Sequence, residues 1–273
     1  ASTTAFLIRA VDARTKQGAE VAIRTDTGLN KLVRAFVFRP ERLKVFFPGA
    51  TAYFEASRES IASNFGQFNG HVVVGATGLV VRHIAPLLKS KKIDPAVVVL
   101  SQDGRWSISL LSGHLGGGNE LAQMAADILG AQAVITTATD VARLPAVEML
   151  AREADLEIED FANLPAVSRR LVEDAELPVY DPGSFLRPFL APWSDHFQII
   201  DQEDKAVGPH IRVDYRLEAA GHPEALVMRP KILALGLGCH KGLPPQALES
   251  FVKTRLREAS LAEKSVAVLA TVE

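Results

Sequence analysis

Short apolar runs alternate with longer amphipathic stretches along the first half of the chain. Runs of apolar or β-branched residues predict strands, and apolar positions three or four apart predict helices. The predicted strands are 45–47, 71–74, 96–100, 106–111 and 133–135, and the predicted helices are 51–64, 79–88 and 119–129. Asp103-Gly104 separates two strand runs and predicts a hairpin. This alternation indicates an N-terminal α/β domain, residues 1–138, with a mostly parallel sheet.

The pattern changes from about Asp140 onward. Helical spacing covers 141–153 and 165–175, short strand runs cover 197–200 and 210–215, and four prolines within 178–193 predict a loop or linker. These elements predict a small α+β middle domain over residues 139–229.

The last stretch has a strand–helix–strand order. Its predicted elements are a strand at 231–235, a helix at 245–258 and a strand at 265–271. One such unit is too small to bury both faces of a sheet. We therefore expect residues 230–273 to be a partial, truncated α/β domain, or a unit that leans on the rest of the chain.

Composition narrows the class of protein. The 273 residues are 48% hydrophobic and 23% charged, with a formal net charge of −2, which is typical of a globular domain and argues against a nucleic-acid surface. No apolar run reaches the roughly 20 residues that span a bilayer, and the N-terminus lacks a signal-peptide pattern. With a single cysteine, Cys239, the sequence predicts a cytoplasmic protein that binds neither nucleic acid nor membrane.

A Gly-rich loop between 106–111 and the helix at 119–129 carries the most chemistry. Its four glycines allow close approach of a ligand, and they lead into a helix N-terminus, which favours anions. The loop holds four glycines and four polar side chains: Ser112, Gly113, His114, Gly116, Gly117, Gly118, Asn119 and Glu120. Imidazole and carboxylate are common general acid–base groups. The alternative is a tight turn with Asn119 as N-cap.

Three known signatures do not match this loop. A P-loop requires Lys and then Ser or Thr after the last glycine, where Asn119 and Glu120 stand. A nucleophile elbow requires glycines two residues either side of Ser112, where Leu110 and His114 stand. A dinucleotide fingerprint requires its first two glycines to be closer in sequence than Gly113 and Gly116 are. Phosphoryl transfer is therefore a weak alternative, because the phosphate-binding lysine is missing.

The loop sequence Leu-Leu-Ser-Gly-His-Leu-Gly-Gly-Gly-Asn-Glu-Leu-Ala resembles the signature of the cobalt-precorrin-5A hydrolases, which have alanine in place of Gly118. The resemblance continues in segments 82–88, 92–99 and 134–140, and in Gly-Leu-Gly-Cys-His-Lys-Gly at 236–242, where His240 replaces the usual arginine. The family also tends to have an acidic residue at Ser101, and its C-terminal domain normally continues several tens of residues further.

The resemblance implies an anionic cobalt tetrapyrrole as substrate. A ring-A δ-lactone would be opened and acetaldehyde released, in anaerobic vitamin B12 biosynthesis. These steps need an activated water, oxyanion stabilisation and proton transfers. We expect His114 as general base, assisted by Glu120, with Ser112 as a possible nucleophile. The backbone N–H groups of 116–118 and the Asn119 amide would hold an oxyanion or a substrate carboxylate.

Further substrate-binding candidates lie at other strand ends and turns. They are Gly75, Thr77, Gly78, Arg82, Thr136, Thr137, Asp140, Gly238, Cys239, His240 and Lys241. Ligands of α/β sheets bind beyond the carboxyl ends of strands, so Gly75 to Gly78 and Thr136 to Asp140 would line one crevice. Helix capping by Thr139 or Asp140 and a solvated Arg82 are the alternatives.

The resemblance implies no cofactor, because the cobalt belongs to the substrate. The sequence shows scattered histidines and no cluster with metal-ligand spacing, so no protein metal site is expected. Neighbouring pathway methyltransferases are possible partners. The rival hypothesis is a non-catalytic protein that binds or hands over the corrinoid intermediate, and only product formation separates the two.

Overall fold

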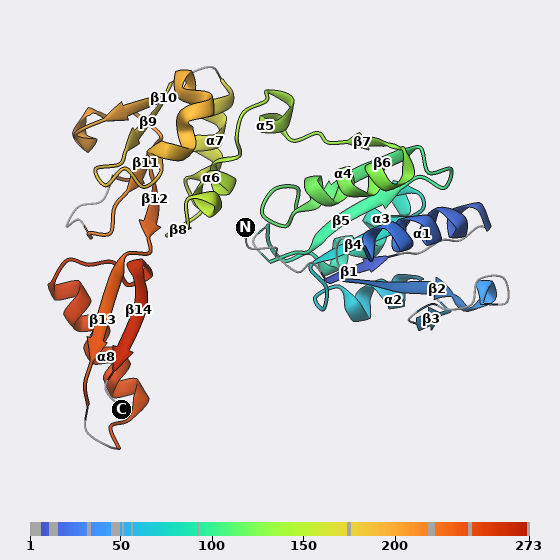
Figure 1. Ribbon diagram of the computed structural model, residues 1–273, viewed down its shortest axis with the longest axis horizontal. Coiled ribbons are helices and arrows are strands. Elements are labelled where there is room, and N and C mark those ends of the chain that lie inside the picture. The colour runs from blue at the N-terminus through green and yellow to red at the C-terminus, as the bar shows by residue number, and fades with distance from the viewer. Residues whose placement is uncertain are drawn as a thin grey trace. The chain divides into compact units, whose positions relative to one another are not determined.

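The computed structural model describes residues 7–10, 16–31, 34–44, 50, 52–55, 57–91, 93–173, 176–217, 222–239 and 242–271 (Figure 1). The chain divides into two compact units, Ala1–Thr137 and Ala138–Glu273. No helix among these described residues combines the length and apolar character needed to cross a membrane.

The first unit is built on a seven-stranded sheet in the order β3-β2-β1-β4-β5-β6-β7. Its strands are β1 (Leu7–Ala10), β2 (Arg34–Pro40), β3 (Ala52–Phe54), β4 (Gly70–Val74), β5 (Ala96–Leu100), β6 (Trp106–Leu111) and β7 (Gln132–Val134). Its helices are α1 (Lys16–Leu29), α2 (Ser57–Asn64), α3 (Thr77–Ile84) and α4 (Gly118–Leu129), with short 3-10 segments η1 (Glu41–Leu43) and η2 (Ala85–Leu87). Neighbouring strands pair in parallel, apart from the antiparallel β5–β6 hairpin.

Both faces of this sheet are covered by helices (Figure 1). Every residue of β4 and β5 is buried. Val72 and Val74 pack in a cluster with α1 and α4, whereas Val73 packs with α2 and α3 on the other face. Since successive strand residues point to opposite faces, a strand covered on both sides is mostly apolar. This explains the continuous apolar runs, and the α/β prediction is confirmed.

Several predicted boundaries in this unit shift. The predicted helix 51–64 is wrong at its start, because Ala52–Phe54 form strand β3 beside the end of β2 before α2 begins at Ser57. Pairing at a sheet edge overrides the local helical pattern here. Helix 79–88 is shorter than predicted, since α3 ends at Ile84 and Pro86 lies in η2. The predicted strand 45–47 lies outside the described residues.

The second unit contains a five-stranded sheet in the order β10-β9-β11-β12-β8. Its strands are β8 (Leu156–Ile158), β9 (Leu177–Tyr180), β10 (Phe197–Ile200), β11 (His210–Val213) and β12 (Ala225–Pro230). The helices are α5 (Ala138–Val141), α6 (Val147–Glu153) and α7 (Leu164–Val172), with 3-10 segments η3 (Arg187–His196) and η4 (Glu203–Lys205). Pairings are parallel except that of β8 with β12.

Two predictions for the middle region are wrong. Residues 178–193 are no linker, because β9 and η3 occupy most of them. Pro178 is tolerated in β9 because β11 pairs only with Val179 and Tyr180, so Pro178 lies where the strand has one neighbour. The predicted helix 141–153 is split into α5 and α6, with Arg143 at a positive φ of 56° between them.

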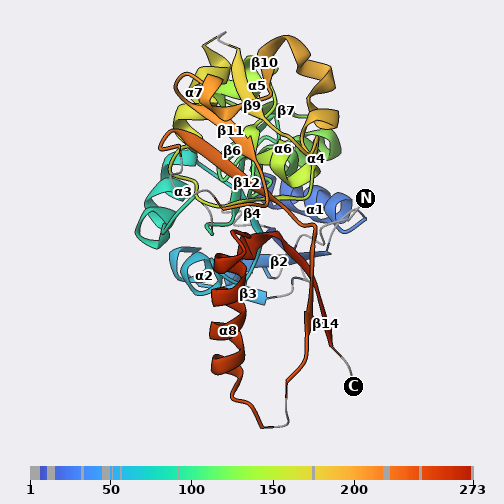
Figure 2. The ribbon, with the colours of Figure 1, turned by 90° about the vertical axis from the view of Figure 1, so that its left-hand side faces the viewer.

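The last part of the second unit is a strand–helix–strand piece. It comprises β13 (Leu233–Leu237), α8 (Pro245–Glu258), the 3-10 segment η5 (Glu263–Ser265) and β14 (Val266–Thr271), and its two strands are parallel. Figure 2 shows α8 and β14 of this piece in red. Large apolar side chains stay exposed, including Phe251 at 55% and Leu269 at 67%. Polar contacts join it to the five-stranded sheet, for example Lys264 of η5 with Glu157 of β8. The three-domain division remains a prediction.

Candidate active site

The Gly-rich loop joins β6 to α4 through two residues in the left-handed region. Ser112 has a φ of 55° and Gly117, the residue before the helix, a φ of 78°. Backbone N–H groups of Gly117, Gly118 and Asn119 donate to the carbonyls of His114 (2.8 Å), Ser112 (2.9 Å) and Gly113 (2.9 Å). These bonds fold the loop back on itself.

Three glycines of the loop leave no room for a side chain. A Cβ at Gly116 would lie 2.4 Å from the Cβ of Ser112 and 2.8 Å from its carbonyl oxygen. At Gly113 it would lie 2.7 Å from the Asn119 amide oxygen, and at Gly118 2.6 Å from the Leu111 carbonyl oxygen. Real Cβ atoms do not come this close, so the compact turn depends on these glycines.

The expected oxyanion donors need correction. The N–H groups of Gly117 and Gly118 already donate within the loop. Among the described residues, no backbone carbonyl accepts from the Gly116 N–H, so of the three expected donors this one could bind an incoming ligand. The expectation that three consecutive N–H groups face a ligand is therefore wrong.

The catalytic candidates occupy different settings. His114 is half-buried in the loop. The Ser112 hydroxyl donates to the Asp94 carbonyl, 2.8 Å away, which ties the loop to the residues before β5. Glu120 is exposed in the first turn of α4, and its carboxylate has no hydrogen-bond or ion-pair partner among the described residues, so it does not orient His114 here.

Asn119 connects the loop to the end of β7. It is not the N-cap, because the helix begins at Gly118, and its side chain is buried. Its amide donates to the Thr137 hydroxyl at 3.0 Å. This side-chain hydrogen bond joins the Gly-rich loop to the segment after β7, which the sequence analysis treated as separate candidates. Thr136 beside it is exposed, and Asp140 lies exposed in α5, in the second unit.

Gly75, Thr77, Gly78 and Arg82 lie at the opposite end of the sheet from the loop. Leu111, the last residue of β6, pairs with Val97 near the start of β5, whereas Val74 pairs with Leu100 at its end. Three strand residues, about 10 Å, separate these positions. The expectation that Gly75 to Gly78 share one crevice with Thr136 and Thr137 is wrong, because β6 and β7 run antiparallel to β5 and end at the same end of the sheet as the loop.

The end of β4 has its own structural significance. The chain leaves β1 toward β2 and β3 and returns to β4 on the other side of β1, which makes a topological switch point between β1 and β4. Ligands of open α/β sheets bind at such points, beyond the strands' carboxyl ends. Thr77 and the exposed Gly78 open α3 there, and Arg82 is exposed one turn further on.

The C-terminal candidates are only partly described. Gly238 and Cys239 follow β13 and are exposed, and Cys239 is a free thiol. His240 and Lys241 lie outside the described residues.

The same regions match known proteins. A family model described as cobalamin synthesis G N-terminal matches residues 59–140, and one described as cobalamin biosynthesis central region matches residues 145–230. The chain belongs to the CbiG family of cobalamin biosynthesis proteins. The Gly-rich loop and Thr137 both lie within the N-terminal match.

Relatives of this CbiG-family chain have a common name. A cobalt-precorrin-5A hydrolase of Priestia megaterium is 34% identical over 228 residues, which are 79% of this chain and 60% of that protein. One of Salmonella typhimurium is 32% identical over 235 residues, 82% of this chain and 64% of that protein. The chain spans less than two thirds of their lengths. A crystal structure of a cobalamin biosynthesis protein G homolog from Sulfolobus solfataricus matches with TM-score 0.44 and 18% identity, covering 98% of this chain and 73% of that chain.

The central region of this CbiG-family chain holds a buried polar network that the sequence reading missed. Glu203 contacts both His210 (3.1 Å) and Arg212, and Arg212 also donates to Asp214 at 2.8 Å. All four are buried. The missed signal is the alternation of His210 and Arg212 in β11, and Asp214 directly after it, with apolar residues, since charged residues in a buried strand need partners.

Ionisation is coupled across this network. Burial alone would raise the pKa of Glu203, but the hydrogen bond with His210 and the nearby Arg212 cation hold that pKa below its usual range. Burial opposes the charged form of His210, yet its bonds to Glu203 and the Gly208 carbonyl raise its pKa.

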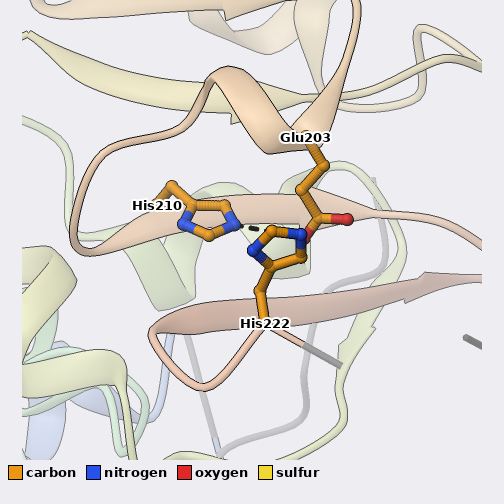
Figure 3. A group of neighbouring side chains, drawn as sticks. All are labelled: Glu203, His210 and His222. Carbon is orange, nitrogen blue, oxygen red and sulfur yellow. Dashed lines mark hydrogen bonds and ion pairs between the residues drawn. The ribbon is translucent and has the colours of Figure 1, made fainter. Parts of the chain in front are cut away.

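This CbiG-family chain brings together three potential metal-ligating side chains that spacing along the sequence does not reveal. Glu203, His210 and His222 offer ligand atoms that all lie within 4.8 Å of one another (Figure 3). They are seven or more residues apart in sequence, and the pairing of β11 with β12 brings them together.

Proposed function

We propose that this CbiG-family chain is a cobalt-precorrin-5A hydrolase of anaerobic cobalamin biosynthesis. It would open the ring-A δ-lactone of its cobalt tetrapyrrole and release acetaldehyde, giving cobalt-precorrin-5B. The observation that carries the proposal is the match of two proteins named cobalt-precorrin-5A hydrolase over 79% and 82% of this chain. These matches extend over most of both units rather than over one domain.

His114 would be the general base that activates water for attack on the lactone carbonyl. Its support is the setting: a half-buried imidazole in a turn held by backbone bonds, beside the Gly116 N–H, which no backbone carbonyl of the described residues accepts. Water would add to the carbonyl carbon, and the ring C–O bond would break as a proton reaches the departing oxygen. A donor at the developing oxyanion lowers the barrier of this step, and the Gly116 N–H would fill that role.

The other loop residues take supporting roles in this proposal. Ser112 would hold the loop to the start of β5 through its bond to Asp94 rather than act as a nucleophile, because its proton is already engaged. Asn119 and Thr137 would fix the end of β7 beside the loop. Glu120, being exposed, would contribute little to the chemical step.

The remaining substrate contacts are also proposals. The macrocycle carries acetate and propionate groups, which Arg82 and the donors at the end of β4 would bind. Substrate binding by Gly238 to Lys241 stays a prediction. The cobalt would enter with the substrate, so the reaction itself would need no protein cofactor. Hand-over of the product to pathway methyltransferases and a cytoplasmic location stay predictions.

The test is acetaldehyde release from anaerobically prepared cobalt-precorrin-5A. We expect the wild-type chain to release acetaldehyde, and His114→Ala to lose about 10²–10⁴-fold in rate, as for removal of a general base. Glu120→Gln changes an exposed side chain directly after the loop. It is the matched control and should keep most of the activity.

Binding measurements separate the rival functions. A wild-type chain that binds the macrocycle without releasing acetaldehyde would be a carrier, and the hydrolase proposal would fail. Release that persists unchanged in His114→Ala would leave the hydrolase intact but remove His114 as its base.

A further inference from the structure

Three side chains of the central region converge on one point (Figure 3). Glu203 comes from η4, His210 opens β11, and His222 precedes β12. Their ligand atoms lie within 4.8 Å of one another; the first two residues are buried and His222 is half-buried. The proposed reaction at the Gly-rich loop uses none of them.

The His210 ring has an acceptor at each nitrogen. Nδ1 lies 2.9 Å from the Gly208 carbonyl oxygen, and Nε2 lies 3.1 Å from the Glu203 carboxylate. A carbonyl cannot donate, so Nδ1 carries the hydrogen and donates it. In the neutral ring Nε2 then carries a lone pair, and this lone pair faces the anionic oxygen of Glu203. That contact is repulsive unless a cation, either a proton or a metal ion, lies between them.

Metal-binding histidines have this same arrangement. The nitrogen that does not bind the metal usually donates to a backbone carbonyl or carboxylate, which fixes the tautomer and the ring orientation. Gly208 supplies that carbonyl here. Ligating carboxylates are themselves hydrogen-bonded, and Arg212 holds the second oxygen of Glu203. The supporting contacts of a metal site are therefore already built.

The local charge also calls for a cation. Glu203 and Asp214 are two buried or nearly buried carboxylates, and Arg212 pairs with both. With a neutral His210, one negative charge is left over in a region with low exposure to water, where an uncompensated charge is costly, so either a proton on His210 or a metal ion must balance it. A divalent ion at Glu203 and His210 would compensate it.

The spacing fits a small tetrahedral ion after a modest adjustment. With metal–ligand bonds of about 2.0–2.1 Å, two tetrahedral ligands stand roughly 3.3 Å apart. Glu203 and His210 are already 3.1 Å apart. The His222 ring, edge-on to His210 with centroids 5.5 Å apart, would need to approach by a distance on the order of 1.5 Å.

We propose that Glu203, His210 and His222 bind a divalent transition-metal ion of the zinc class. Two imidazoles and one carboxylate favour zinc, cobalt or nickel over magnesium or calcium, which prefer all-oxygen sites. The ion would tie η4 and the start of β12 to β11. This site is additional to the proposed hydrolase and independent of it.

The experiment is a calorimetric titration of the metal-free chain with Zn²⁺, repeated with Co²⁺ to record its visible absorption. We expect one Zn²⁺ per chain and the intense absorption of tetrahedral Co²⁺. His222→Ala should weaken binding at least tenfold without unfolding the chain, because His222 is half-buried and lies outside the bonds that hold Arg212. His196→Ala, a half-buried histidine of η3 in the same unit, is the control and should bind as the wild type does.

Two results would overturn the proposal. The first is the absence of saturable binding by the wild type, which would mean that a proton alone occupies the space between His210 and Glu203. The second is binding that survives in both His222→Ala and His210→Ala, which would locate the ion elsewhere. Neither result involves acetaldehyde release, so the hydrolase proposal stands or falls separately.

Discussion

The Gly-rich loop of the first unit and the polar network of the second are built from different parts of the chain. The loop is contiguous, and its shape depends on backbone hydrogen bonds and on glycines that leave no space for a Cβ. The network joins side chains from η4 and β11, held by charge and hydrogen bonds in a buried setting. The loop is therefore sensitive to added volume, whereas the network is sensitive to the loss of any one charge.

The largest expected effect tests the network. Glu203→Ala would leave Arg212 and His210 without their shared partner in a buried site, and breaking a buried pair costs about 3–5 kcal/mol. Urea unfolding followed by circular dichroism measures this loss. Asp201→Ala removes the carboxylate of the exposed Lys205–Asp201 pair in the same unit and should leave the midpoint unchanged. Equal effects of the two variants would show that the network is not the stabilising feature we describe.

Two glycine substitutions with opposite expected signs test the loop. Gly116→Ala would force Ser112 to move, since the new Cβ would lie 2.4 Å from it, at a cost of about 1–3 kcal/mol. Gly78→Ala meets nothing within 4 Å in helix α3 and should stabilise the chain by about 0.5–1 kcal/mol. Thermal unfolding of both variants checks the signs. A stabilising Gly116→Ala would contradict the loop geometry.

A smaller effect tests the bond between the loop and β7. Thr137→Val keeps the shape of the side chain but removes the hydroxyl that accepts from Asn119, and the loss should be about 1 kcal/mol. Thr136→Val changes the exposed neighbour in the same way and should be nearly neutral. Denaturant midpoints compare the two. If they shift equally, the Asn119–Thr137 bond does not hold the loop in place.

The smallest effect concerns pH and the link between β8 and the strand–helix–strand piece. Hydrogen bonding from Lys231, helped by Lys264, lowers the pKa of Glu157 below its ordinary value of 4.5. A carboxyl whose folded pKa is depressed stabilises the fold above its unfolded pKa and loses this contribution as pH falls below about 4.5. Because Glu157 is 40% exposed, the effect should be small. Glu157→Gln should flatten the acid side of the stability profile, and an unchanged profile would contradict the assignment.

Local sequence patterns were sufficient to predict the helices and strands whose conformation does not depend on distant parts of the chain. The helix 245–258 has the predicted bounds, and the strands at 96–100 and 106–111 and the hairpin between them are as expected. These segments carry strong apolar periodicity or a turn that only certain residues form. Prediction failed at Ala52–Phe54 and at Pro178, where pairing with another strand decides the conformation.

The candidate site shows the same division. The residues of the loop stand side by side in the sequence, so their chemistry was visible there. Which N–H groups are engaged, and the bond from Asn119 to Thr137, follow from how the chain folds back on itself. Gly75 and Thr77 were grouped with Thr136 and Thr137 because strand direction cannot be inferred from composition, and the antiparallel β6 and β7 separate them.

The amino-acid sequence by itself determined the α/β class, the Gly-rich turn into α4 and the resemblance to a family, because each depends on neighbours along the chain. Only the tertiary structure decided the direction of β6, the partners of the loop, and the meeting of Glu203, His210 and His222. The physical reason is that strand pairing and buried charge compensation act between residues far apart in sequence, whereas turn geometry and apolar periodicity act within a few residues.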